Sequence, residues 1–213
     1  MSEQKNKKYQ ITDIAHNDYP FLHRIRALHA FGDVAAGDIG GFVEGEYNLS
    51  FDPGDSAWIY DDAIAAGCAV IERDSKLRNQ AIACDEARVS MGSVLLDSAR
   101  AEDQAYVRGA VLRDHARASG DAMLLDSVAT QSGPILEGNC AVYGKVSGGV
   151  RISGSVLVLH AEEVINASRD LLVINDQGRS ILRSPSRDIF SQNERTETQK
   201  RNRTKPKSRG QDR

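Results

Sequence analysis

The chain is poor in cysteine, in aromatic side chains and in long apolar segments. Its three cysteines, Cys68, Cys84 and Cys140, are too few and too widely spaced for a disulfide framework or a Cys-x-x-Cys metal site. No apolar run approaches the roughly 18 residues that a membrane-spanning helix needs, and residues 1–8 are polar rather than signal-like. We therefore expect no membrane association and a reduced, cytoplasmic setting.

Aromatic and charged residues are unevenly distributed along the chain. Nine of the 12 aromatic residues lie within the first 60 positions, and only Tyr106 and Tyr143 occur between positions 61 and 160. The net charge of −3 combines unlike parts, because residues 183–213 hold ten basic and four acidic side chains. The rest of the chain is therefore acidic.

A six-residue repeat runs through the middle of the chain. Each unit begins with a small residue, has an aliphatic residue or Ala two places later, and usually has a turn former two places further on. One residue is missing after Gly109, and the repeat then resumes at Ala110. The small residues are Ala57, Ala63, Ala69, Ser75, Ala81, Ala87, Ser93, Ala99, Ala105, Ala110, Ala116 and Ala122, with Val128, Pro134 and Cys140 continuing the series.

Every third unit is alike, which adds a second period of 18 residues. Because equivalent residues of neighbouring strands stack about 4.8 Å apart, this period predicts an all-β, three-sided parallel β-helix with one coil per three units. Its narrow interior has no room for aromatic rings, and no long loop is expected to interrupt the coils. The predicted inward columns are Ile59, Leu77, Leu95, Leu112 and Thr130; Ile71, Val89, Val107, Leu124 and Val142; and Ala65, Ala83, Ala101, Ala118 and Leu136.

The repeat resembles that of the hexapeptide-repeat, left-handed parallel β-helix superfamily, and the left hand is expected from this resemblance alone. The entry segment, with Gly32-Asp33-Val34 and Gly40-Gly41-Phe42-Val43-Glu44 before Trp58-Ile59-Tyr60-Asp61-Asp62, resembles a bacterial and prophage-associated group of β-helix proteins. Some members of that group are labelled acetyltransferases on repeat similarity alone. The resemblance covers about residues 9–160 and implies no catalytic residue.

The pattern divides the chain into five segments. Residues 1–8 are expected to be disordered, and residues 9–56 form an aromatic-rich cap with an irregular first coil. Residues 57–160 form the repeat, and residues 161–183 form a closing hairpin around Asn175-Asp176-Gln177-Gly178-Arg179. Residues 184–213 are polar and basic, and disorder is expected there.

Two groups of residues are candidates for catalysis or metal binding. A histidine in the coils is the usual general base of hexapeptide acyltransferases, and His115 is the best placed, with an acyl-CoA donor implied by that alternative. An exposed corner histidine is the simpler interpretation. Corner oxygens could hold Ca²⁺, but Asx residues favour such corners for backbone reasons, so we expect no metal. These corner residues are Asp61, Asn79, Asp97 and Asp114, with Asp85 and Asp103 on another corner.

Outward-facing apolar residues are candidates for protein contacts. Two faces are predicted to display them and to support self-association and binding of another protein. One face carries Trp58, Tyr60, Val94, Leu96 and Val111, and the other carries Val70, Tyr106, Met123, Leu125 and Tyr143.

The basic tail is a candidate for weak, non-specific contact with nucleic acid or another polyanion. Its basic residues are Lys200, Arg201, Arg203, Lys205, Lys207 and Arg209. The sequence therefore favours a non-catalytic binding scaffold without a cofactor over the acyltransferase alternative. The resemblance to prophage-associated proteins implies a phage-encoded protein that acts on a host macromolecule.

Overall fold

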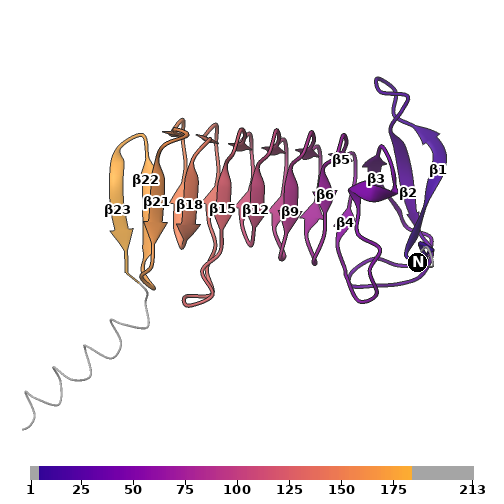
Figure 1. The fold of residues 1–213 in the computed structure, drawn as a ribbon, viewed down its shortest axis with the longest axis horizontal. Coiled ribbons are helices and arrows are strands. Elements are labelled where there is room, and N and C mark those ends of the chain that lie inside the picture. Colours follow the sequence, from indigo (N-terminus) through magenta and orange to yellow (C-terminus); the bar gives the residue numbers. More distant parts are fainter. Residues whose placement is uncertain (1–4, 184–213) are drawn as a thin grey trace, which may run out of the picture.

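The computed structural model describes residues 5–183, which coil into a parallel β-solenoid with three faces (Figure 1). Face 1 is an eight-stranded sheet of β4 (Trp58–Ile59), β7 (Lys76–Leu77), β10 (Val94–Leu95), β13 (Val111–Leu112), β16 (Ile135–Leu136), β19 (Val150–Ile152), β22 (Leu171–Asn175) and β23 (Gly178–Leu182). Face 2 is a nine-stranded sheet of β1 (Tyr9–Ala15), β2 (His23–Ala27), β3 (Ile39–Val43), β5 (Ile64–Ala65), β8 (Ile82–Ala83), β11 (Arg100–Ala101), β14 (Arg117–Ala118), β17 (Ala141–Val142) and β20 (Leu157–Val158). Face 3 is a six-stranded sheet of β6 (Val70–Ile71), β9 (Arg88–Ser90), β12 (Tyr106–Arg108), β15 (Met123–Leu125), β18 (Lys145–Gly148) and β21 (Glu163–Asn166), and a short 3-10 helix, η1, spans Glu46–Asn48.

The interior consists of three columns of buried side chains, as the 18-residue period predicts. Up to Leu124 each column has the predicted members, because strands one coil apart pair in register, as Leu77 does with Leu95 and Ala83 with Ala101. The alanine column allows the three faces to approach closely, which leaves no room for a larger side chain. The prediction of an all-β, three-sided parallel β-helix is confirmed.

Beyond Leu124 the predicted columns are wrong. Leu112 is followed on face 1 by Leu136, not by Thr130, and Ala118 is followed on face 2 by Val142. Leu124 is followed on face 3 by Val146. The cause is an inserted loop at residues 126–134, which contradicts the expectation of uninterrupted coils. The loop is longer by one repeat unit than the three-residue corner between β9 and β10, so it preserves the six-residue period while moving every later strand to the next face.

The corners of the solenoid are built from residues with left-handed backbone. Asp61, Asn79, Asp97 and Asp114 share one corner, between faces 1 and 2, and have φ between 52° and 61°. The carboxylate of Asp61 accepts from the backbone N–H of Asn79, and that of Asp97 accepts from the N–H of Asp114 in the next coil. The acidic corner residues therefore bind the backbone of the coil that follows them.

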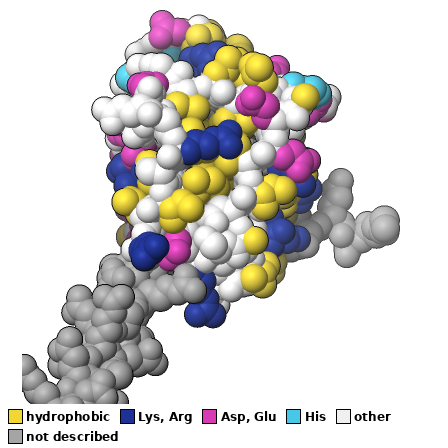
Figure 2. All heavy atoms as spheres, turned by 90° about the vertical axis from the view of Figure 1, so that its left-hand side faces the viewer, with side chains coloured by type: hydrophobic (Ala, Val, Ile, Leu, Met, Phe, Trp, Pro, Cys, Tyr) yellow, Lys and Arg dark blue, Asp and Glu magenta, His cyan; other side chains and the backbone are white. Residues whose placement is uncertain are grey.

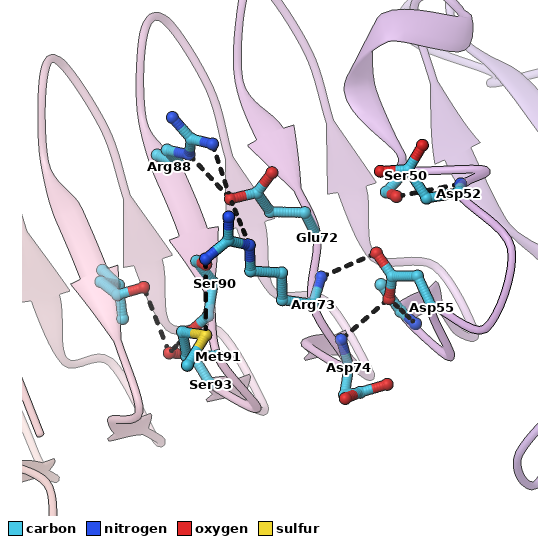
Figure 3. A network of polar contacts seen from close by, with 12 residues as sticks. Ser50, Asp52, Asp55, Glu72, Arg73, Asp74, Arg88, Ser90, Met91 and Ser93 are labelled. Carbon is cyan, nitrogen blue, oxygen red and sulfur yellow. Dashed lines mark hydrogen bonds and ion pairs between the residues drawn. The ribbon is translucent and has the colours of Figure 1, made fainter. Parts of the chain in front are cut away.

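The corner between faces 3 and 1 is less regular (Figure 3). Both oxygens of Asp55 accept backbone N–H bonds, from Arg73 at 2.8 Å and Asp74 at 2.9 Å, and both of these residues have positive φ. Ser93 Oγ donates to the Ser90 carbonyl and accepts from the N–H of Ala110. That second bond bridges the coil in which one residue is missing after Gly109, so the shortened corner keeps its backbone groups satisfied.

The N-terminal end is closed by an aromatic cap. Strands β1, β2 and β3 pair antiparallel, and β3 then pairs in parallel with β5 of the first regular coil. Trp58 is 1% exposed, with its ring 6.2 Å from that of Tyr9 and 5.3 Å from that of Phe31. The prediction that Trp58 is an outward interface residue is therefore wrong, because the cap folds over the first strand of face 1.

Lys8 completes this cap from its rim, so the expectation that residues 1–8 are disordered is wrong at this residue. Its Nζ lies 5.0 Å from the centroid of the Phe31 ring and donates to the carbonyls of Ser50 at 2.9 Å and Ala57 at 2.8 Å. Burial lowers the pKa of Lys8 to about 8, although Asp55, Asp74 and Asp52 act in the opposite direction. A neutral amine still has two protons for these two carbonyls.

The C-terminal end carries exposed apolar side chains (Figure 2). The hairpin of β22 and β23 is antiparallel, as predicted, and β23 is the last strand of face 1 with all five residues exposed. Side chains more than half exposed gather on the last strands and corners of the three faces: Leu157, Leu159, Ile165, Ile181 and Leu182. The predicted disordered tail and its polyanion-binding residues lie outside the described part of the chain.

Overpacking the alanine column is expected to destabilise the solenoid. Ala101→Leu adds three methyl or methylene groups to a fully buried site, and we expect a loss of about 1–3 kcal/mol in the free energy of unfolding, measured by urea denaturation. Ala141→Leu, on the same face but pointing outward and half-buried, is the control. Equal effects of the two changes would contradict the narrow interior.

The lowered pKa of Lys8 predicts a pH-dependent stability. Between pH 8 and 10.5 the unfolded chain retains the proton that the folded protein has lost, so stability rises with pH over this window. The gain is at most about 3 kcal/mol, because each pKa unit corresponds to about 1.4 kcal/mol. We expect the free energy of unfolding of the wild type, measured against that of Lys8→Met, to rise across this window. A constant difference would show that Lys8 has an ordinary pKa.

Candidate functional site

The inserted loop is the main departure from the repeat and is anchored at its base. The Asp126 carboxylate lies 3.0 Å from Nε of Arg108, and the Asp126 N–H donates to the Arg108 carbonyl. Gly133 lies so close to Gly109 that a Cβ would overlap its carbonyl oxygen. Pro134 is buried, and its carbonyl accepts from the N–H of Val111. Both ends of the loop are therefore held by the solenoid.

The tip of the loop projects from the corner between faces 3 and 1. An antiparallel bridge joins Ser127 and Ser132, in which the N–H of Ser127 donates to the carbonyl of Ser132, and the hydroxyls of Thr130 and Ser132 lie 2.7 Å apart. Val128 is 78% exposed, the highest value among the large hydrophobic residues of the described chain that are exposed. Residues 127–134 contain no charge, whereas 27% of the whole chain is charged. An uncharged tip with an exposed aliphatic side chain is suited to contact with a protein.

Apolar side chains flank the loop on both faces. On face 1, Val94, Val111 and Ile135 are paired neighbours on β10, β13 and β16, and their column ends at Lys76 and Arg151. On face 3, Tyr106 pairs with Met123, and Leu125 occupies the last position of β15, next to the loop. We call these residues and the loop the corner surface: Val94, Val111, Ile135, Tyr106, Met123, Leu125 and residues 126–134.

Some of the predicted interface residues lie outside the corner surface. Tyr143 follows β17 on face 2 rather than sharing face 3 with Tyr106, because the inserted loop moves it by one face. Leu96 lies on face 1 beside the column of Val94, and Val70 lies on face 3 at the first coil.

Tyr60 belongs to a polar cluster near the cap. Its hydroxyl donates to Asp33 at 2.7 Å, and its ring lies 3.9 Å from the guanidinium carbon of Arg78. Asp33 also pairs with Lys76 and Arg78, and the hydrogen bonds from Lys76 and Tyr60 hold the pKa of its carboxyl well below the ordinary value. Burial and Asp33 raise the pKa of Tyr60. The cluster ties the cap to face 1 and takes Tyr60 out of the predicted interface.

Sequence reasoning missed Ile135 and the loop with Val128. The signals were present: Thr130 is polar at a predicted inward position, and Pro134 replaces a small residue at the start of a unit. Both breaks in the pattern fall in the inserted segment.

His115 is exposed at the corner between β13 and β14, and its backbone N–H donates to the Gly138 carbonyl. The inserted loop arises at a different corner, between faces 3 and 1. The structure therefore does not bring the loop and His115 together along the coil.

The carboxylates at the corners accept hydrogen bonds from backbone N–H groups. Besides the bonds already described, Asp103 accepts from the N–H of Gly120, and Asp114 accepts from the N–H of Gly138. Within residues 5–183, no three His, Cys, Asp or Glu side chains are grouped so as to hold a metal ion.

Searches of protein-family models and of curated proteins found no match to the chain. Among residues 5–183, no helix has the length and apolar character required to cross a membrane.

The loop is expected to be dispensable for folding. Deleting residues 128–133 leaves Asp126, Ser127 and Pro134 between β15 and β16, the same number of residues that joins β9 to β10. We expect the circular dichroism spectrum to be retained, with the free energy of unfolding within about 1 kcal/mol of wild type. Deleting residues 99–104, which removes β11, is the control and is expected to unfold the protein. Unfolding of the loop deletion would show that the loop supports the coils.

Proposed function

We propose that the protein is a non-catalytic binding scaffold of the cytoplasm that holds another protein at its corner surface. The observation that carries this proposal is the loop, anchored at both ends, whose uncharged tip projects Val128 between two sets of apolar side chains. Insertions in solenoid proteins lie on one side of the stack and often form the binding side. The rest of the solenoid supplies a rigid support for this surface.

Self-association is part of the same proposal and is supported by the C-terminal end. The outer edge of β23 is unpaired within the described chain, and the exposed apolar side chains of the last coil surround it. An unprotected edge of this kind favours pairing with another strand. The resemblance of the entry segment to prophage-associated proteins favours a host macromolecule as the other partner.

The acyltransferase alternative rests on the resemblance and on His115. It requires an acyl-CoA donor, and the proposal of a binding scaffold requires no cofactor. Saturable binding of acetyl-CoA in calorimetry, together with its loss in His115→Ala, would overturn the non-catalytic proposal.

Photo-crosslinking tests the corner surface. A photoreactive amino acid at position 128 is expected to form a specific adduct in the native cell. The same residue at position 91, on the same corner and with Met91 also exposed, is expected to form none. Ile135→Glu is expected to abolish the adduct at position 128, because it places a charge in the apolar column. Adducts of equal yield at both positions, or an adduct insensitive to Ile135→Glu, would contradict the proposal.

A further inference from the structure

A groove of about 500 Å³ lies on face 2, beneath the loop that joins β1 to β2. Its floor consists of Phe42, Ile64 and Ile82, which are paired neighbours on β3, β5 and β8. Leu22 covers Phe42 and Ile64, whereas Ile82 is only half-buried. The floor is therefore apolar and remains open toward the third strand.

The wall of the groove is held in place by its own hydrogen bonds. Nδ1 of His16 accepts from the backbone N–H groups of Asp18 at 3.1 Å and Tyr19 at 3.3 Å. The His16 ring meets the Phe42 ring edge-on, with centroids 4.7 Å apart. These contacts shape the loop before any ligand binds, which reduces the cost of binding.

Arg24, the one Lys or Arg side chain that lines the groove, is already paired with a carboxylate. Arg24 stacks 4.2 Å from the Phe42 centroid, donates to the carbonyls of Gly40 and Asp61, and pairs with Asp62. The next cation along the floor, Arg100 on β11, pairs with Glu102 and is outside the groove.

The rim of the groove is acidic. Asp18 lies on the loop, and Asp62 and Gln80 also line a second hollow of about 330 Å³ at the corner between faces 1 and 2. That hollow reaches Asp61 and Asp97, which lie two coils apart. The two hollows together are lined by four carboxylates, and Arg24 is the one Lys or Arg among their lining residues. An apolar floor with this excess of negative charge fits a cation on an alkyl stem.

We propose that this groove binds a Lys or Arg side chain from an extended, basic segment of a partner protein. The alkyl stem lies on the half-buried Ile82, and the cation meets Asp62 and Asp18. Two coils span about 10 Å, and a segment in the polyproline II conformation advances about 9 Å in three residues, after which its side chains point to the same side again. A second basic residue three positions along the segment therefore reaches Asp97. The groove is on face 2, away from the corner surface, so a negative result at this site would leave the proposed function standing, and the reverse also holds.

A labelled peptide of four Lys-Ser-Ser repeats tests the site by fluorescence anisotropy with the full chain. We expect saturable binding that weakens about tenfold between 50 and 300 mM salt, because the rim is solvent-exposed. The same peptide with acetylated lysines keeps the stem and loses the charge, and it is expected to bind at least about tenfold more weakly. Absence of saturable binding, or equal binding of the acetylated peptide, would overturn the proposal.

Matched variants locate the binding. Asp97→Asn and Ile82→Gln are each expected to weaken binding about fivefold. Asp103→Asn removes the same charge at an equivalent corner outside the groove, and Val70→Gln changes an outward aliphatic residue on face 3; neither is expected to have an effect. Asn is compatible with this corner because Asn79 occupies it in the preceding coil, with φ of 61°. Equal weakening by Asp97→Asn and Asp103→Asn would show only general attraction to an acidic protein and would overturn the site.

Discussion

The hydrogen bonds between successive coils are the constraint on which the structure depends. A backbone N–H on one strand donates to a carbonyl one coil later, as Lys76 does to Ser93 and Arg88 to Ala105. This register places like residues above one another, so each position of the repeat becomes a column with one environment. The alanine column keeps the faces close, and the aromatic rings of the chain are accordingly concentrated at the N-terminal end, where the cap residues Tyr9 and Phe31 both contact the ring of Trp58.

The same register explains which features could be predicted from the sequence. The columns through Leu112, Ala118 and Leu124 follow from a period that leaves little freedom in the interior. The columns beyond them are predicted wrongly, because the loop exceeds an ordinary corner by one repeat unit, which keeps the six-residue phase and changes only the face. Thr130, a polar residue, and Pro134 are its signs in the sequence. The prediction that Tyr143 shares a face with Tyr106 is wrong because of this change of face. The burial of Trp58 does not follow from the repeat, because the cap that covers it belongs to the irregular part of the chain.

The candidate surfaces were harder to predict than the fold. Outward positions are free of the interior's size limit, so Val94 or Leu125 fits a plain surface and a binding surface equally well in sequence. The loop can be recognised as a fixed projection only from its contacts in the structure. Asp126 pairs with Arg108, and Gly133 packs against Gly109, which is distant in sequence. The groove on face 2 likewise joins His16 with Ile82, and no repeat relates those two residues.

Charge has two different roles on this solenoid, and the difference depends on location. At the corners, carboxylates such as Asp97 and Asp103 accept backbone bonds from the next coil, which explains their spacing without a metal. Asp97 and Asp103 therefore have the same role toward the backbone, and their other neighbours distinguish them. Asp97 borders a hollow that continues into an apolar groove, whereas Asp103 is not part of that lining. A structural carboxylate can thus become part of a binding site wherever the chain places apolar surface beside it, at no cost to the corner that it supports.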